Sequence, residues 1–122
     1  MKILIAEDDP FIMKILQMSL NRAGYEFICC IDGLEAMKSI ELHKPDIILV
    51  DIMLPYFSGL EILGNVKQSA NPVPVIVVSA MGQTSVIDEA MKLGADGYIS
   101  KPFTMETLFA NINQLSQKAL TA

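Results

Sequence analysis

Short apolar segments alternate with longer segments of helical periodicity from one end of this 122-residue chain to the other. The segments at residues 47–50 and 75–78 contain no polar residue, which is typical of strands buried on both faces of a sheet. Two parallel strands need a crossover between them, and that crossover is usually a helix. The alternation therefore predicts an α/β domain with a doubly wound parallel sheet and helices on both faces.

Five strands and five helices are predicted in strict alternation. We expect the strands at residues 2–6, 26–30, 47–50, 75–78 and 98–100. We expect the helices from Pro10 until Gly24, from Asp32 until Pro45, from Ser58 through Val66, from about Ser85 to Leu93, and from Thr104 to about Lys118. Three of the starts carry capping signals, which are Asp9 before Pro10 and the capping-box patterns Asp32–Glu35 and Ser58–Glu61.

Length and composition bound the class of protein. A chain of 122 residues is expected to form one domain, spanning residues 1–122. Apolar residues make up 52% of it, yet its uniformly apolar runs are far shorter than the ~18 residues of a membrane span. The apolar run at residues 3–6 ends at Glu7, Asp8 and Asp9, so it does not resemble a secretory signal. We therefore expect a cytoplasmic protein without a membrane partner.

Charge and cysteine content exclude further classes. The formal net charge is −5, and four of the 14 acidic residues are Glu7, Asp8, Asp9 and Asp51. The rest of the chain is nearly neutral and has no basic stripe, so direct binding to nucleic acid is not expected. The adjacent pair Cys29-Cys30 lies in a predicted strand, where neighbours point to opposite faces. These thiols cannot form an ordinary bridge and are too few for a zinc site, so we interpret them as core residues.

Polar residues stand at the carboxyl ends of four predicted strands. Glu7 and Asp8 follow the first strand, Asp51 the third, Ser79 the fourth and Lys101 the fifth. In a doubly wound sheet these ends share one edge, where ligands bind. At ~4 Å and an effective dielectric constant near 20, each pair of carboxylates repels by about 4 kcal/mol. A positive group must therefore share the site.

Lys101 supplies one positive charge at that edge. Oxygen ligands without histidine or thiolate suit a hard divalent cation, Mg²⁺ or alternatively Mn²⁺. Asp51, between such a cation and the ammonium, is a candidate nucleophile toward phosphorus because both positive groups neutralise phosphoryl oxygens. A single aspartate at a strand end is usually a cap or turn residue, so the combination of groups, rather than any one of them, favours this interpretation.

As a set, Glu7-Asp8-Asp9, Asp51, Ser79-Ala80 and Lys101-Pro102-Phe103 resemble the strand ends of the receiver domain of two-component response regulators. The resemblance extends over essentially the whole chain. It implies a flavodoxin-like (βα)5 sandwich with a five-stranded parallel sheet in the order 2-1-3-4-5. It also implies a cis peptide between Lys101 and Pro102.

The resemblance implies a role for each site residue. Asp51 is the expected phosphoacceptor and a ligand of Mg²⁺. Asp8 is expected to bind the ion directly, Glu7 through water or hydrogen bonds, and Met53 through its backbone carbonyl.

Two hydrogen-bonding groups and one switch residue complete the implied site. Ser79 and Lys101 are expected to bind the phosphoryl oxygens. Tyr98 matches the aromatic switch position and is expected to turn inward behind Ser79 after phosphorylation, which would bias the face formed by the last two helices and the last strand.

The implied partners follow from that chemistry. The phosphoryl group is expected from a sensor histidine kinase or a histidine phosphotransfer protein, or from acetyl phosphate. The output is expected through a downstream target protein or through an effector domain outside this sequence. The chain would be a monomer or a phosphorylation-dependent dimer. It would be a signalling domain that catalyses its own phosphorylation and dephosphorylation, rather than an enzyme with a separate substrate.

Three alternatives are weaker. A flavodoxin-like redox module would need hydroxyl and glycine groups after the first strand, where this chain has three acids. A phosphatase with an aspartyl intermediate would need a carboxylate at Met53. A receiver-like interaction module that is never phosphorylated remains the third reading, although every group expected for phosphorylation is present.

Overall fold

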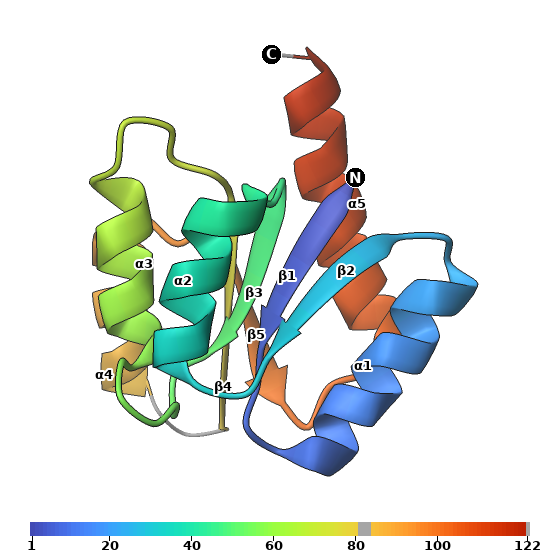
Figure 1. Cartoon of the computed structure of the whole chain (residues 1–122), viewed down its shortest axis with the longest axis horizontal. Helices are drawn as coiled ribbons and strands as arrows, with labels where there is room; N and C mark the ends of the chain where they lie inside the picture. Colours follow the sequence, from blue (N-terminus) through green and yellow to red (C-terminus); the bar gives the residue numbers. More distant parts are fainter. Residues whose placement is uncertain (81–83, 122) are drawn as a thin grey trace.

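The computed structural model of the chain is a single layer of strands between two layers of helices (Figure 1). It describes residues 1–80 and 84–121, and the side chains of residues 1–80 and 84–116. The strands are β1 (Lys2–Ala6), β2 (Glu26–Cys30), β3 (Ile47–Asp51), β4 (Val75–Ala80) and β5 (Gly97–Lys101). They form one parallel sheet in the order β2-β1-β3-β4-β5, which confirms the predicted topology.

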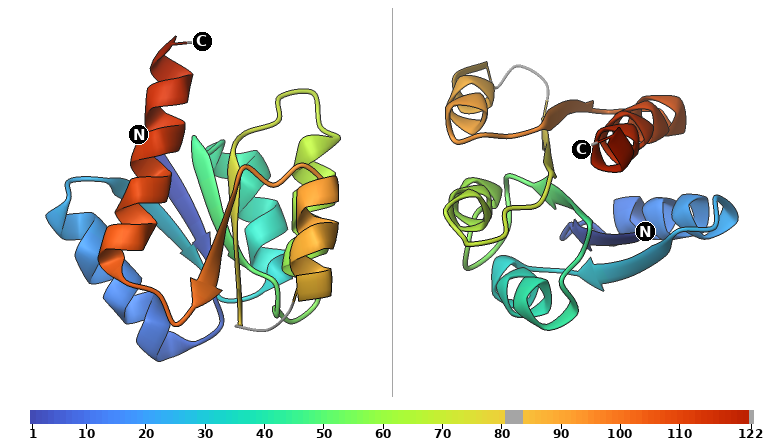
Figure 2. Two further views of the ribbon diagram at one scale, coloured as in Figure 1. Left: turned by 180° about the vertical axis from the view of Figure 1, so that it is seen from behind. Right: turned by 90° about the horizontal axis from the view of Figure 1, so that it is seen from above.

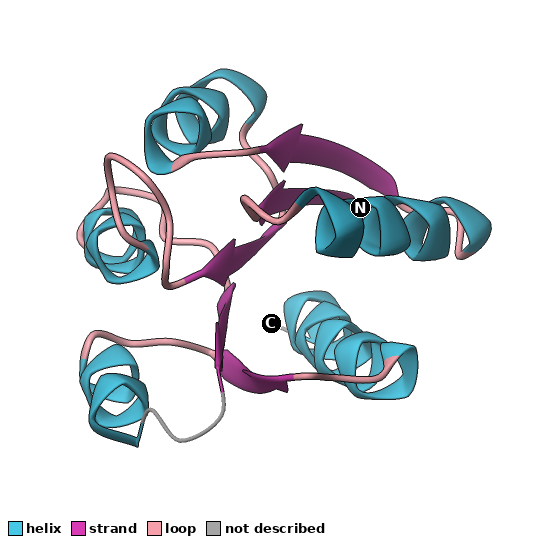
Figure 3. Ribbon diagram, turned by 90° about the horizontal axis from the view of Figure 1, so that it is seen from below, coloured by secondary structure: helices cyan, strands magenta, loops and turns pink. Residues whose placement is uncertain are grey.

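The helices cover both faces of the sheet. They are α1 (Pro10–Arg22), α2 (Gly33–His43), α3 (Gly59–Lys67), α4 (Thr84–Lys92) and α5 (Met105–Thr121). Helices α1 and α5 lie on one face, and α2, α3 and α4 lie on the other (Figures 2 and 3). None of the helices in the described part of the chain is long and apolar enough to span a membrane.

Three of the predicted polar residues belong to the strands, whereas Glu7 and Asp8 follow β1 as predicted. Asp51 is the last residue of β3, and Ser79 lies inside β4, one residue before its end. Lys101 is likewise the last residue of β5, where it is in register with Ala80. The predicted ends of β3, β4 and β5 were therefore too early, because the backbone ladder continues through residues whose side chains are polar, while those of β1 and β2 are confirmed. The Lys101-Pro102 peptide is cis.

The helix starts show how the sequence fixes local structure. The carboxylate of Asp9 accepts hydrogen bonds from the backbone nitrogens of Phe11 and Ile12, so Asp9 caps α1. Ser58 and Glu61 form the complete capping box that their spacing predicts. Asp32 caps α2, but Glu35 accepts its return bond from Ile31 rather than from Asp32. The second predicted capping box is therefore only half formed.

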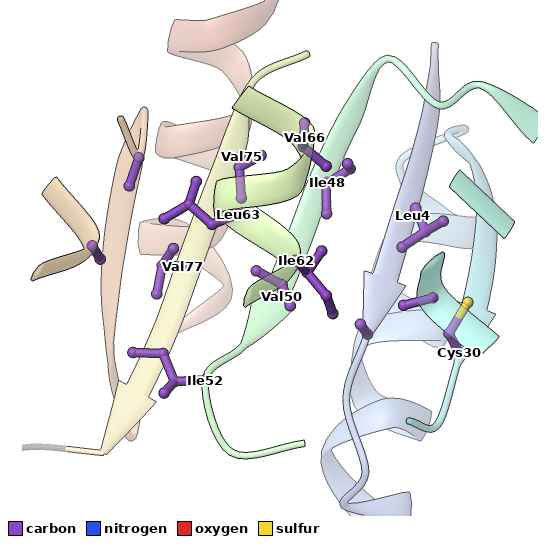
Figure 4. Close-up of a cluster of buried hydrophobic side chains, with 14 residues drawn as sticks. Leu4, Cys30, Ile48, Val50, Ile52, Ile62, Leu63, Val66, Val75 and Val77 are labelled. Carbon is purple, nitrogen blue, oxygen red and sulfur yellow. The ribbon is translucent and has the colours of Figure 1, made fainter. Parts of the chain in front are cut away.

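Two apolar cores, one on each face, stabilise the sheet. The core beneath α2, α3 and α4 contains strand residues such as Ile48 and Val77 together with Ile62 and Leu63 of α3 (Figure 4). The other core lies beneath α1 and α5. Each fully buried aliphatic side chain contributes about 1.5–3 kcal/mol relative to an exposed one. The adjacent cysteines divide between the two cores as predicted, since Cys30 belongs to the first and Cys29 packs against the second.

Candidate functional site

Three ionisable side chains meet at the carboxyl edge of the sheet. Glu7 follows β1, while Asp51 and Lys101 end β3 and β5. Each stands two positions after a strand residue that packs beneath α1 and α5; these residues are Ile5, Leu49 and Ile99. Alternation along a strand returns to the same face every second residue, so the three charges share that face. The order of the sheet therefore brings together residues from opposite ends of the chain.

Lys101 joins the two buried carboxylates. Its ammonium group donates to both oxygens of Glu7, at 2.9 and 3.1 Å, and also to Oδ2 of Asp51. The exposed fractions of Glu7 and Asp51 are only 3% and 5%. A pair of buried negative charges would otherwise repel strongly, so Lys101 provides the positive group that the sequence argument requires.

Burial and hydrogen bonding shift the pKa values of Glu7 and Lys101. Burial raises the pKa of Glu7 to about 7, and the hydrogen bond with Asp51 adds to this effect while the ammonium of Lys101 opposes it. Burial disfavours the charged form of Lys101, but its hydrogen bonds with Asp51 and Glu7 outweigh burial and raise the pKa of the ammonium. The structure therefore favours a protonated Lys101 throughout the neutral range.

Both carboxylate oxygens of Asp51 accept hydrogen bonds. Oδ1 accepts a hydrogen bond of 2.9 Å from the backbone nitrogen of Met53, and Oδ2 contacts Lys101. Two donors from different elements fix the plane of this carboxylate at the edge of the sheet. Met53 itself turns its side chain outward, with 67% of it exposed.

The acid trio fits a hard cation. Glu7, Asp8 and Asp51 each offer one oxygen, and these oxygens lie within 4.8 Å of one another. Asp8 is exposed, whereas the other two are buried. Such a set of oxygen ligands at an open edge suits Mg²⁺ or Mn²⁺, which prefer carboxylate, carbonyl and water oxygens.

Ser79 and Tyr98 form a second group on the opposite face. Ser79 is 1% exposed, and its Oγ lies 2.8 Å from the hydroxyl oxygen of Tyr98. The resemblance implies that Tyr98 turns inward behind Ser79 only after phosphorylation, whereas the two hydroxyls are already in contact in this structure. The described contacts of Ser79 Oγ are with Tyr98 and, at 3.4 Å, with the carbonyl of Ala80. The predicted site residues therefore lie in two groups, one of charges and one of hydroxyls.

Sequence reasoning missed the role of Gly59. A Cβ atom at this position would lie 2.4 Å from the carbonyl oxygen of Asp51 and 2.8 Å from Cα of Ile52. The Gly59 nitrogen also donates to the Ile52 carbonyl at 2.9 Å. The start of α3 thus contacts the backbone of Asp51 directly. One signal in the sequence could have revealed this contact. Glycine is a poor helix former, so a glycine at the first position of a capped helix indicates that a side chain there would not fit.

Comparison with known proteins gives a consistent result. A family model described as the response regulator receiver domain matches residues 3–113. The chain is 34% identical over 118 residues to the alkaline phosphatase synthesis transcriptional regulatory protein PhoP of Bacillus subtilis, a match that covers 97% of this chain and 49% of that protein. It is 32% identical to the response regulator MprA of Mycobacterium avium, with 97% and 52% covered.

A solved structure is equally similar. The receiver domain of the Francisella response regulator 1452 superposes with a TM-score of 0.90 at 31% identity, and the match covers 97% of this chain and 98% of that one. The chain spans about half the length of the curated relatives it matches.

Proposed function

This chain belongs to the response regulator receiver domain family, and on that premise we propose that Asp51 accepts a phosphoryl group from a histidine kinase or a histidine phosphotransfer protein. The observation that carries the proposal is the environment of Asp51. Its carboxylate is buried at the edge of the sheet, oriented by the Met53 nitrogen and neutralised by Lys101. A nucleophile toward phosphorus needs this combination of fixed geometry and nearby positive charge.

The reaction forms one bond and breaks one. A carboxylate oxygen of Asp51 forms the new O–P bond as the N–P bond to the donor imidazole breaks, and the donor keeps the electron pair. Lys101 neutralises negative charge on the acceptor and then on the phosphoryl oxygens. Ser79 donates a hydrogen bond to another of these oxygens from the opposite face of the sheet.

The acid trio is the proposed Mg²⁺ site, with Mn²⁺ as the alternative ion. Asp8 and Asp51 would bind the ion directly, the Met53 carbonyl would be a further ligand, and Glu7 would act through water or hydrogen bonds. When bound, the ion would supply positive charge that draws the acceptor and phosphoryl oxygens together. The clustering of the three carboxylates within 4.8 Å supports this assignment.

The response to phosphorylation is proposed for the face formed by α4, β5 and α5. Lys101 and Tyr98 both belong to β5, so a new bond between Lys101 and the phosphoryl group would act on that strand directly. Charge-assisted hydrogen bonds contribute about 1.5–3 kcal/mol each. Two or three of them approach the ~5.5 kcal/mol that shifts the populations of two conformations from 1:99 to 99:1. The phosphorylated chain would then select a downstream target or act on an effector domain.

A groove beside Lys101 suits the protein that donates the phosphoryl group. It has a volume of about 370 Å³ and is lined by Phe11, Ile12, Ile15, Leu16, Lys101, Pro102, Phe103 and Met105. Phe11 is 73% exposed, although it is a large apolar residue. Because the groove reaches Lys101, which contacts Asp51, it would bind an apolar face of the donor near the reacting carboxylate. We place this exchange in the cytoplasm, with residues 1–122 acting as one receiver domain.

Intact-mass measurement after incubation with Mg²⁺ and acetyl phosphate tests the proposal. Wild type is expected to gain the mass of one phosphoryl group, and Asp51→Asn is expected to gain none. Asp88→Asn, which changes an exposed aspartate of α4, is the matched control and should behave as wild type. Equal phosphorylation of wild type and Asp51→Asn would exclude Asp51 as the acceptor.

A further inference from the structure

The loop between β3 and α3, residues 52–58, lies against the start of α2. We propose that Gly33, the first residue of α2, positions this loop and through it the carboxylate of Asp51, a role that rests on the proposed function of Asp51. Helix α2 supplies none of the charged groups of the site, so Gly33 is a positioning residue that acts through the loop. It acts by the space that it leaves, because it has no side chain.

Both ends of this loop are fastened at one backbone carbonyl. The carbonyl oxygen of Ile52 accepts hydrogen bonds from the nitrogens of Leu54, at 3.1 Å, and Gly59, at 2.9 Å. Inside the loop, the Met53 nitrogen donates to Oδ1 of Asp51 at 2.9 Å. The position of this donor therefore depends on how the rest of the loop is held.

Helix α2 holds the tip of the loop. The Gly33 nitrogen is at the first position of the helix, where it has no acceptor within the helix, and it donates to the Pro55 carbonyl at 2.9 Å. The Phe57 nitrogen donates to the same carbonyl, also at 2.9 Å. The Phe57 side chain packs against the core beneath α2, α3 and α4. The tip is thus attached both to α2 and to an apolar core.

Space, rather than backbone conformation, requires glycine at position 33. Gly33 is helical and is not among the residues with positive φ, so other residues could adopt its backbone conformation. A Cβ atom there, however, would overlap the carbonyl oxygen of Phe57 and would lie 2.7 Å from both the carbonyl carbon and the Cβ of Phe57. Backbone atoms cannot rotate out of the way as the end of a side chain can. An added methyl group would therefore displace the loop.

The loop already contains a strained residue. Tyr56 has φ of 71°, in the left-handed region that bulky residues rarely adopt, and it is 76% exposed, so packing of its side chain does not explain this conformation. Such a conformation persists only where the surrounding contacts impose it. The contacts of the flanking Pro55 and Phe57 do so. If the contact with Gly33 is disturbed, the loop should relax and no longer fix Met53.

Hydrogen exchange of the Met53 amide tests this positioning without metal or phosphoryl donor. In EDTA, NMR should show that this amide exchanges about three- to tenfold faster in Gly33→Ala than in wild type, the equivalent of weakening one hydrogen bond. The Tyr25 amide, which is bonded to the Leu20 carbonyl at the opposite edge of the sheet, should keep its wild-type rate. Gly64→Ala makes the same change where a Cβ would meet nothing within 4 Å, and it should leave both amides unchanged.

Phosphorylation by acetyl phosphate tests the consequence. Gly33→Ala should slow phosphorylation of Asp51 about tenfold or more, since a misplacement of about 1 Å can cost about a hundredfold. Lys38→Gly destabilises the same helix at an exposed position and should react at the wild-type rate. Pro55→Gly loosens the exposed tip from the side of the loop. It should speed exchange at Met53 and slow phosphorylation, as Gly33→Ala does.

The outcomes separate this proposal from the proposed function. Wild-type exchange at Met53 in Gly33→Ala, or faster exchange with phosphorylation at the wild-type rate, overturns the role of Gly33 and leaves Asp51 as the acceptor. An equal loss of phosphorylation in Lys38→Gly shows that lost stability is the cause and overturns that role as well. If Gly33→Ala does not fold, Pro55→Gly carries the same two tests. A wild-type protein that is not phosphorylated at Asp51 overturns the proposed function, whereas the exchange measurement still reports on the contact between Gly33 and the loop.

Discussion

At the scale of single residues, Asp51 is restrained from three directions. Met53 binds one carboxylate oxygen, Lys101 binds the other, and Gly59 contacts its backbone carbonyl. These contacts come from the following loop, from β5 and from the start of α3. A nucleophile restrained in this way loses little conformational entropy on reaction.

The contact of Gly59 with Asp51 predicts a costly substitution. Gly59→Ala should lower the free energy of unfolding by about 1–3 kcal/mol, because its methyl group would overlap the Asp51 carbonyl. Gly64→Ala in the same helix should instead raise it by about 0.5–1 kcal/mol, since a Cβ there would meet nothing within 4 Å. Urea denaturation of both variants measures the difference. Equal effects of the two substitutions would contradict this account of Gly59.

The raised pKa of Glu7 predicts how the stability of the metal-free protein depends on pH. Its pKa in the folded protein is raised from 4.5 to about 7, so the folded state binds this proton more tightly than the unfolded chain does. The stabilisation from neutral Glu7 is fully present below about pH 4.5 and is lost as the pH rises through about 7. In EDTA, the urea midpoint of wild type should therefore fall between about pH 5 and pH 8 relative to that of Glu7→Gln.

The control in that experiment is the variant itself. Glu7→Gln retains a hydrogen-bonding side chain but cannot ionise, so only the contribution of Glu7 is removed. Parallel curves for the two proteins would show that burial does not raise the pKa of Glu7.

Sequence alone predicts which residues reach the edge of the sheet but not which of them touch. The ends of parallel strands share one edge, so Glu7, Asp51 and Lys101 could be placed there from strand positions. The bond between Lys101 and Glu7 joins residues 94 positions apart, and it depends on side-chain lengths and on the curvature of the sheet. The resemblance relates Tyr98 to Ser79, but their hydrogen bond before phosphorylation was not predicted, because neither strand's sequence reveals the register between β4 and β5.

At the scale of elements, capping residues predict where helices begin more accurately than apolar patterns predict where strands end. Asp9 and Ser58 bind the free nitrogens of α1 and α3, and this chemistry is visible in the sequence. The extension of β4 through Ser79 to Ala80 is not visible in the sequence, because the apolar pattern stops at Val78 while the backbone ladder continues.

The end of α2 offers a test at this scale. Lys44 follows the helix in the left-handed region, with φ of 48°, and its nitrogen donates to the Ile40 carbonyl. Glycine adopts this conformation without strain, so Lys44→Gly should raise the free energy of unfolding by about 1 kcal/mol. Lys38→Gly, at an exposed position inside α2, should lower it by about 1 kcal/mol. If both variants lose stability in thermal or urea unfolding, the capping account of Lys44 is wrong.

At the scale of the whole molecule, binding of a cation to the acid trio should stabilise the fold. A ligand that binds only the folded state raises its stability by RT ln(1 + [L]/Kd). Increasing Mg²⁺ should therefore raise the urea midpoint of wild type. Asp8→Asn should abolish this response, because the substitution removes one of the three clustered carboxylates.

Asp9 provides the matched control for that titration. Asp9→Ala removes the cap of α1 and should lower the free energy of unfolding by about 0.5–2 kcal/mol. It should nevertheless respond to Mg²⁺ as wild type does, since Asp9 is outside the trio. A response that is lost in Asp9→Ala and retained in Asp8→Asn would contradict the assignment of the metal ligands.

Locating the phosphoryl group tests the central claim most directly. Borohydride reduces an acyl phosphate of aspartate to homoserine, and peptide mass spectrometry identifies the modified position. After incubation with Mg²⁺ and acetyl phosphate, we predict homoserine at position 51 and at no other aspartate. Homoserine at a different aspartate, or none in a protein that has gained a phosphoryl group, would contradict the claim that this buried carboxylate is the acceptor.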